Sequence, residues 1–431
     1  MSHHIILGAG PAGVVAAESI RKLSPSDDIT LIGDEAGPAY SRMAIPYMLI
    51  GQIDVAGTYL RKDPGHFEQL GIKTIHARAK SIDTRSRTVM LDRGDQLVYD
   101  TLLIATGSRP ITGGIPGIDS PNVINCWTLD DARAIIERAK PGMRVLQLGA
   151  GFIGCIIMEA LAARGVQLRV VERRERMVSR MMGQTAGDMI QRWCEAKGVT
   201  VHVGVTVESV HDGKPMKVRL GDGAELEADV VISAIGVRPC IDFLQGSDLK
   251  CVMGVITDDA MQTNVAGVYA AGDCAEAFDS ATQKPVVSAI QPNAVDQARV
   301  AAANMVAHVR GAQAKARIKL VTQINVLDTL GLVSTSFGEW QGVNGGDQVA
   351  LTDAASGRHL NLQFDGDVMV GCNSVGWTEH IGVMRGLVEG RVHLGEWKDR
   401  LMHDPTRLME AYLACALAQD QWSGAHDERR R

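Results

Sequence analysis

The sequence predicts an α/β protein with two parallel-sheet domains and a third, α+β domain at its C-terminal end. Two observations carry this prediction. An apolar strand, a glycine-rich turn and a helix follow one another in residues 3–23, and the same succession recurs from residue 144. The last third of the chain instead alternates apolar and polar residues, as strands do, before a stretch with helical periodicity.

The first turn is Gly8-x-Gly10-x-x-Gly13, between a short strand and a helix that begins near Ala12. In such a turn the first glycine permits a tight bend, the second lets a pyrophosphate approach the backbone, and the third lets the helix pack on the strand. The helix start then presents free N–H groups to the phosphates. The turn therefore predicts a Rossmann-like dinucleotide-binding domain.

An acidic residue follows the second strand, within "DDITLIGDE". An acid about 20 residues after the turn accepts hydrogen bonds from ribose hydroxyls in such domains. Here the position at the end of the strand is Gly33, so the acid is Asp34 or Glu35. We favour Asp34.

The second turn is Gly149-x-Gly151-x-x-Gly154, and its second strand ends at Glu172. A carboxylate there favours NAD, because it binds a 2′-hydroxyl and repels a 2′-phosphate. Arg173 and Arg174 follow directly, so NADPH stays an alternative. Two such modules predict two dinucleotides, and the usual pair is a flavin and a nicotinamide.

Four further motifs resemble those of the two-domain flavoproteins of the pyridine nucleotide-disulfide oxidoreductase superfamily. They are "YDTLLIATGSRP", "VVISAIGVRP", "TNVAGVYAAGDCAE" and "IQPNAVDQARVAAANM". The resemblance covers roughly residues 3–310 and implies FAD and NAD(H) as cofactors, with no metal. It implies these FAD-binding residues: Gly8, Gly10, Pro11, Ala12, Gly13, Asp34, Arg42, Thr106, Gly107, Gly272 and Asp273. For NADH it implies Gly149, Gly151, Ile153, Gly154, Glu172 and Gly236.

The stretch "GPAYSRMAIPYMLIG", residues 37–51, bears on how electrons leave the flavin. Related thiol enzymes place a reactive cysteine here, but this position is Met43, and residues 1–125 contain no cysteine. A thioether cannot ionise, so thiol chemistry is excluded at this point. The segment is similar to that of ferredoxin reductases at Tyr40 and Arg42. Tyr47 is then the candidate side chain beside the flavin.

The sequence departs from the family pattern at Ile156, where the family usually has a glutamate near the nicotinamide. Glu159 lies one helical turn further on and need not point into the same space. Loss of a polar contact at Ile156 weakens nicotinamide positioning unless the backbone alone holds the ring. Cys274, beside Asp273, is interpreted as a packing residue.

The C-terminal third is similar to the interface domain of the ferredoxin, rubredoxin and nitrite reductase branch, although Trp377 replaces an aspartate of that pattern. We divide the chain into an FAD domain (residues 1–112 and 242–318), an NAD domain (113–241) and an interface domain (319–431). Helical character is expected from about Glu396 onward.

Composition limits the partners and the compartment. The net charge of −6 argues against a broad nucleic-acid surface. No apolar run is long enough to span a membrane, and no signal peptide is expected at the start. The eight scattered cysteines suit a reducing cytoplasm and make neither a disulfide framework nor a metal site.

The resemblance implies an NADH-dependent FAD oxidoreductase whose reduced flavin passes electrons directly to a redox partner such as an iron–sulfur protein. Three alternatives stay open. They are an NADH oxidase that uses oxygen, a flavoprotein subunit of a larger redox enzyme, and a flavin-binding scaffold or redox sensor with poor turnover. The C-terminal domain is expected to pair two copies of the chain in a homodimer.

Overall fold

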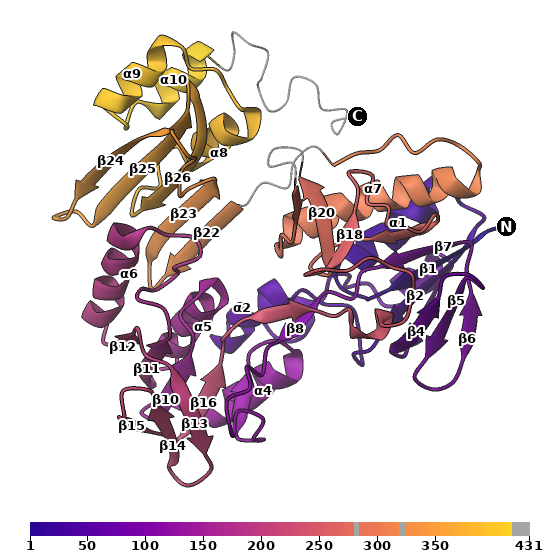
Figure 1. The fold of residues 1–431 in the computed structure, drawn as a ribbon. Coiled ribbons are helices and arrows are strands. Elements are labelled where there is room, and N and C mark those ends of the chain that lie inside the picture. Colours follow the sequence, from indigo (N-terminus) through magenta and orange to yellow (C-terminus); the bar gives the residue numbers. More distant parts are fainter. Residues whose placement is uncertain (280–283, 319–323, 416–431) are drawn as a thin grey trace. The chain divides into compact units, whose positions relative to one another are not determined.

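The computed structural model describes residues 1–279, 284–318 and 324–415, which form two compact units (Figure 1). Within the described ranges, the first unit comprises residues 1–111 and 237–318, and the second comprises 112–236 and 324–415. Each unit is built on a five-stranded parallel sheet. The predicted α/β class with two Rossmann-like sheets is confirmed.

The first sheet has the strand order β19-β7-β1-β2-β3. Its middle strand β1 is an apolar run whose last four residues are buried, as expected for a parallel strand covered on both faces. Helices α1 and α7 pack against each other in the same unit, and both contribute to its core. The strands and helices are β1 (His3–Leu7), α1 (Pro11–Leu23), β2 (Asp28–Gly33), β3 (Ile72–His76), β7 (Thr101–Ile104), β19 (Val268–Ala270) and α7 (Gln291–Val309).

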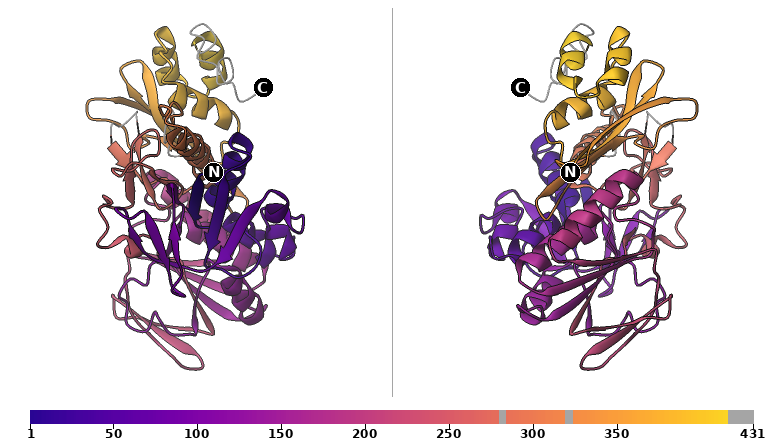
Figure 2. Two further views of the ribbon diagram at one scale, coloured as in Figure 1. Left: turned by 90° about the vertical axis from the view of Figure 1, so that its right-hand side faces the viewer. Right: turned by 90° about the vertical axis from the view of Figure 1, so that its left-hand side faces the viewer.

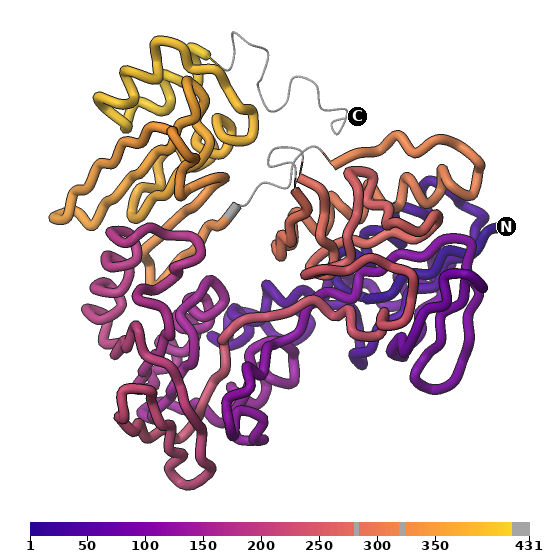
Figure 3. The backbone as a smooth tube through the Cα atoms, viewed as in Figure 1, coloured from indigo at the N-terminus to yellow at the C-terminus, as the bar shows by residue number. Residues whose placement is uncertain are grey.

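Smaller elements surround this sheet. Two three-stranded sheets have the orders β4-β5-β6 and β18-β20-β21, and β8 pairs with β17 in a two-stranded ribbon. Their bounds are β4 (Ala79–Asp83), β5 (Thr88–Leu91), β6 (Gln96–Val98), β8 (Ser108–Pro110), β17 (Val237–Pro239), β18 (Val255–Thr257), β20 (Ala275–Asp279) and β21 (Lys284–Val286). The short helices are η1 (Arg42–Ala44), α2 (Ile45–Leu49), η2 (Ala56–Thr58), α3 (His66–Gln69) and η3 (Asp242–Leu244). The tube in Figure 3 follows the chain out of this unit after β8 and back into it at β17.

The second parallel sheet has the order β12-β11-β10-β16-β9, with a separate antiparallel sheet β13-β14-β15. The strands of the two sheets are β9 (Val123–Asn125), β10 (Arg144–Leu148), β11 (Gln167–Glu172), β12 (Thr200–Val203), β13 (Val207–His211), β14 (Met216–Leu220), β15 (Glu225–Ala228) and β16 (Val230–Ser233). Its helices are α4 (Leu129–Arg138), α5 (Phe152–Ala163) and α6 (Gln184–Ala196). Helix α4 begins with a capping box, in which Asp131 N–H donates to the Thr128 hydroxyl and Thr128 N–H donates to the Asp131 carboxylate.

The C-terminal sheet belongs to the second unit and has the antiparallel order β22-β23-β26-β25-β24. Helix α5 packs on β22, and α6 packs on β26. The elements are β22 (Ile324–Thr329), β23 (Leu332–Gly338), β24 (Asp347–Asp353), β25 (Arg358–Asp365), β26 (Val368–Val375), α8 (Ile381–Gly390), α9 (Glu396–His403) and α10 (Leu408–Cys415). Figure 2 shows the three last helices grouped at this sheet, with which they share an apolar core.

Helical character from Glu396 is confirmed as far as Cys415, and residues 416–431 lie outside the described part of the chain. In the described ranges, no helix combines the length and the apolar character needed to cross a membrane.

Candidate dinucleotide sites

The first glycine turn leaves no room for side chains at two of its three glycines. Gly8 has a φ of +113°, and a Cβ there would lie 2.0 Å from Ala105 O. A Cβ on Gly13 would lie 1.8 Å from Gly8 O. Gly10 has no atom within 4 Å of such a Cβ, so this side of the backbone is open. The geometry fits a pyrophosphate that approaches at Gly10.

The start of α1 supplies the donors for this approach. Gly10 is the N-cap residue and Pro11 opens the helix, and no side chain caps the first N–H groups. Ala12 is buried beneath the turn. Uncapped N–H groups and the positive end of the helix dipole together favour an anion.

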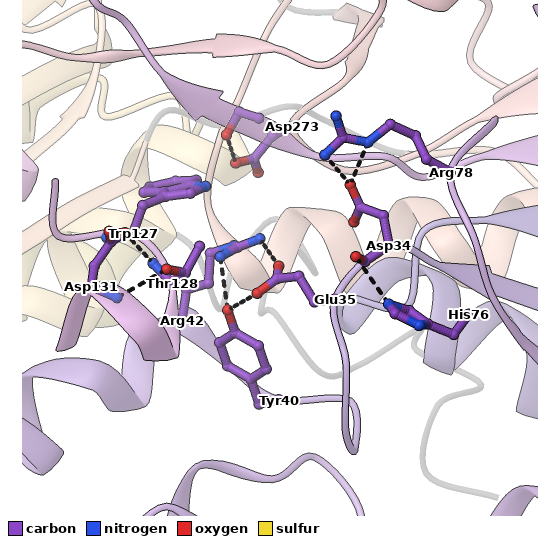
Figure 4. Close-up of polar contacts among 11 residues, drawn as sticks. Asp34, Glu35, Tyr40, Arg42, His76, Arg78, Trp127, Thr128, Asp131 and Asp273 are labelled. Carbon is purple, nitrogen blue, oxygen red and sulfur yellow. Dashed lines mark hydrogen bonds and ion pairs between the residues drawn. The ribbon is translucent and has the colours of Figure 1, made fainter. Parts of the chain in front are cut away.

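Two acidic residues lie after β2, and each is paired with an arginine (Figure 4). Asp34 accepts hydrogen bonds from the Nε and Nη2 atoms of Arg78, at 3.0 and 2.8 Å. Glu35 accepts from Arg42 Nη2 and from the Tyr40 hydroxyl, both at 2.5 Å. Both acids are therefore held in place by charged or polar neighbours. The preference for Asp34 stays a prediction.

Asp273 lies at the same end of the first sheet. Ser108, a residue that the sequence did not single out, donates a hydrogen bond to its Oδ2 atom at 2.7 Å. Burial raises the pKa of Asp273, although the Ser108 hydrogen bond and the positive charge of Arg42 oppose this rise. A Cβ on Gly272 would lie 3.3 Å from the Cβ atom of Ala12, so Asp273 is next to the start of α1.

Thr106 and Gly107 form a further turn of the first unit, which a hydrogen bond holds in place. The Thr106 hydroxyl donates to Cys240 O at 2.7 Å, and Gly107 has a φ of +67°. The predicted FAD residues of the first turn, the Thr106 turn and the Asp273 segment thus lie together at the carboxyl end of one parallel sheet. This is the edge where open α/β sheets bind ligands.

Met43 and Tyr47 lie in η1 and α2, and each side chain is 54% exposed. The assignment of Tyr47 to the flavin stays a prediction.

Cys274 is fully buried, and burial raises the pKa of its thiol to about 11. Such a thiol is inert at neutral pH, in agreement with its interpretation as a packing residue.

The second turn repeats the first. Gly149 has a φ of +98°, and a Cβ there would lie 2.4 Å from Ala234 O, in the segment that leads to Gly236. A Cβ on Gly154 would lie 2.4 Å from Gly149 O, whereas Gly151 has no atom within 4 Å of its Cβ position. The N–H groups at the start of α5 again have no side-chain cap. The second module therefore fits a second pyrophosphate.

Glu172 is 8% exposed, and its carboxylate is bound by the backbone on both sides. Oε2 accepts from Ala150 N–H at 2.8 Å, and Oε1 accepts from Arg174 N–H at 2.9 Å. Each carboxylate oxygen keeps a further lone pair for a ribose hydroxyl. No pattern in the sequence indicates these two bonds, which hold the carboxylate against the turn.

Ile153 and Ile156 are half-buried in the first turns of α5. Glu159, further along the helix, has a pKa that is raised by burial and by the negative charge of Asp328 in β22. This carboxylate is therefore close to the C-terminal sheet. It does not take over the position of Ile156.

The first 304 residues carry the family signature. The family model of the pyridine nucleotide-disulphide oxidoreductases matches residues 2–304. The chain belongs to this family. The predicted superfamily is confirmed, and with it the expectation of an oxidoreductase that uses FAD and NAD(P)H.

Individual relatives of the family extend the similarity over almost the whole chain. The chain is 30% identical to the NADH-dependent phenylglyoxylate dehydrogenase subunit epsilon of Aromatoleum evansii, over 93% of this chain and 95% of that protein. It is 28% identical to an NADH oxidase of Methanocaldococcus jannaschii, with 86% and 87% covered. Among solved structures, a ferredoxin reductase of Rhodopseudomonas palustris has a TM-score of 0.81 at 26% identity, with 90% and 95% covered.

Proposed function

We propose that the protein oxidises NADH and transfers the electrons through FAD to a separate redox protein, such as an iron–sulfur protein. The first unit is the FAD site and the second is the NADH site. The domain limits assigned above, residues 1–112, 113–241, 242–318 and 319–431, are part of this proposal.

The lack of a usable thiol carries the proposal. Residues 1–125 contain no cysteine, and the position used by thiol enzymes is Met43. All eight cysteines are free, and among the described residues only Cys251 is exposed, while Cys240 is half-buried. Electrons therefore have no disulfide relay and leave from the flavin itself.

The role of the protein's residues in this proposal is to bind and orient the two cofactors. The open backbone at Gly10 and the start of α1 would hold the FAD pyrophosphate, and Asp273 would accept a hydroxyl of the flavin side chain. Gly151 and the start of α5 would hold the NADH pyrophosphate, and Glu172 a ribose hydroxyl. FAD, when bound, supplies the electron-transfer chemistry that no side chain here can supply.

The relatives support a protein acceptor and also name a second candidate. A ferredoxin reductase shares the fold over most of the chain, and a subunit of an NADH-dependent dehydrogenase is similar over 93% of it. We therefore propose as the second candidate that the chain is the flavoprotein subunit of a larger redox enzyme. An NADH oxidase is a third, on the similarity to the Methanocaldococcus jannaschii protein of that name.

Anaerobic rapid mixing of the flavin-loaded protein with NADH, and separately with NADPH, tests the proposal. Fast loss of the oxidised-flavin absorbance with NADH and slow loss with NADPH would support it. Subsequent mixing with oxygen or with a ferredoxin separates an oxidase from a reductase. If neither nucleotide bleaches the flavin, the NADH reaction is wrong, and the flavin-binding scaffold takes its place.

We further propose that the C-terminal sheet pairs two copies of the chain. Its edge strand β24 is largely exposed, and its outer edge has no partner strand in the described chain. Light scattering coupled to gel filtration gives the mass directly. A monomer at micromolar concentration would refute the dimer without bearing on the NADH reaction.

A further inference from the structure

Gln147 is a polar residue in the middle of an apolar strand. It is 0% exposed in β10, the central strand of the second parallel sheet, where Val145, Leu146 and Leu148 are also buried. The residue stands two positions before the first glycine of the second turn. The equivalent position of the first module is the apolar Ile6.

The two residues occupy the same place beneath their turns. A Cβ on Gly154 would lie 3.1 Å from Gln147 Nε2, and a Cβ on Gly13 would lie 3.3 Å from Ile6 Cγ2. The first module shows that an aliphatic side chain fills this space. A carboxamide is therefore not required there for packing.

The amide group of Gln147 connects the turn to the helix. Nε2 donates to Gly149 O at 2.8 Å and to Gly154 O at 2.9 Å. Gly149 begins the turn, and Gly154 lies in the first turn of α5. The two hydrogen bonds span the backbone N–H groups between these residues, which would face the pyrophosphate.

The carbonyl oxygen of the same side chain lowers the stability of the fold. Gln147 Oε1 is buried and has no hydrogen-bond partner among the described residues. Burial of an unpaired amide oxygen is unfavourable, whereas an aliphatic residue would avoid that penalty. Sites where a sequence departs from such rules are often functional.

We propose that Gln147 is a positioning residue for the nicotinamide nucleotide. Its carboxamide links the second turn to α5 through two hydrogen bonds. These bonds hold in position the backbone N–H groups that would receive the pyrophosphate. Small displacements of a bound nucleotide are sufficient to slow transfer of a hydride. The inference rests on the proposed NADH site in the second unit.

The test compares Gln147→Met and Gln147→Leu with Thr257→Val. The Thr257 hydroxyl is likewise buried and without a hydrogen-bond partner among the described residues, and Thr257 lies in β18 of the first unit, outside the unit that holds the second turn. Binding of ADP-ribose, which carries the pyrophosphate but no nicotinamide, is measured by titration calorimetry. The melting temperature, the FAD content and the rate of flavin reduction by NADH are measured on the same samples.

We expect the Kd for ADP-ribose and the KM for NADH to rise about tenfold in the Gln147 variants, as loss of two positioning hydrogen bonds would predict. The melting temperature should change little, because the loss of the two hydrogen bonds is offset by removal of the buried, unpaired Oε1 atom. FAD content and the limiting reduction rate should also change little. Thr257→Val should leave ADP-ribose binding unchanged. This combination separates positioning from a structural role, which would lower the melting temperature.

Three results would overturn the inference. Both Gln147 variants could bind ADP-ribose as wild type does, or both could fail to fold, which would make the residue structural. If the wild-type protein binds neither ADP-ribose nor NADH, the proposed NADH site is wrong and the inference falls with it. Wild-type binding with unchanged variants would remove the inference alone.

Discussion

Gly151 has room for a methyl group in the folded chain, so one substitution can separate nucleotide binding from folding. Gly151→Ala should fold normally, at a cost below about 1 kcal/mol for alanine at an N-cap. The methyl group would occupy the space through which the pyrophosphate approaches, so we expect the Kd for NADH to rise at least about tenfold. Fluorescence titration measures this constant.

Gly382→Ala is the matched control for this change. Gly382 lies inside α8 and also has no atom within 4 Å of its Cβ position. Alanine there should stabilise the helix by roughly 0.5–1 kcal/mol without effect on NADH. Unchanged NADH binding in Gly151→Ala would place the pyrophosphate elsewhere.

His4 should make the protein less stable in mild acid. The residue is fully buried in β1, between the Thr101 hydroxyl at 2.6 Å and Asp27 Oδ2 at 3.3 Å. Burial lowers the pKa of His4, so below about pH 6.5 the unfolded chain takes up a proton that the folded chain resists. Stability therefore falls as the pH decreases from 6.5 toward the lowered pKa.

Asp27 adds a second loss of stability at lower pH. Burial alone would raise its pKa, but hydrogen bonds from Ser24, Ser2 N–H and His4 outweigh burial and lower the pKa to about 2. Stability present above pH 3.8 is thus lost as the pH falls toward 2. Urea unfolding between pH 7.5 and 5.5 covers the His4 effect together with that of His359, whose pKa is also lowered by burial, and a His4 variant separates the two. His4→Gln should reduce that slope, while His3→Gln, at a half-buried position in the same strand, should not.

Cys251 should be the fast-reacting thiol of the native protein. It is exposed, whereas the other cysteines are buried apart from half-buried Cys240. Its pKa is raised by partial burial of the thiol and by the Glu276 carboxylate, so labelling with a thiol reagent should be faster at pH 8.5 than at pH 7. Cys251→Ser should abolish fast labelling without slowing flavin reduction. A parallel loss of electron transfer would contradict the thiol-free route.

At the scale of elements, the sequence predicted those parts of the sites that are set by local geometry. The two turns lie at the positions that their glycines predict. Gly8 and Gly149 both have a positive φ and lie against a neighbouring backbone segment, which leaves no room for a side chain. Contacts between distant segments could not be predicted in this way. Ser108 and Asp273 are 165 residues apart, and no sequence pattern in either segment predicts their hydrogen bond. Likewise, Gln147 stands out in the sequence as polar, but its acceptors are known only from the fold.

Asn373 joins β26 to the segment before α6, and its loss should loosen that junction. Its Nδ2 donates to Met181 O at 2.9 Å, and Gly183 N–H donates to its Oδ1 at 3.3 Å. Asn373→Ala leaves a buried carbonyl without this donor, so we expect a loss of about 1–3 kcal/mol in unfolding free energy. Chemical denaturation measures it. Asn361→Ala, on the neighbouring strand β25, should cost less because Asn361 is half-buried and pairs with the side chain of Gln363.

At the scale of the whole molecule, the residues proposed for the two cofactors belong to different compact units. Every residue assigned to FAD lies in the first compact unit, and every residue assigned to NADH lies in the second. A ligand that binds only the folded form stabilises the unit that holds it, by about 2.7 kcal/mol at 100 times its Kd. Ligands should therefore shift the unfolding of the two units independently.

Scanning calorimetry of the flavin-free protein tests this independence. Added FAD should raise the unfolding temperature of one transition, and ADP-ribose should raise that of another, because each ligand contacts a separate core. Gly151→Ala should reduce the ADP-ribose shift and keep the FAD shift, which assigns the transitions. A single transition that both ligands raise equally would mean that the two units unfold together. The assignment of one cofactor to each unit would then depend on the binding data of the variants alone.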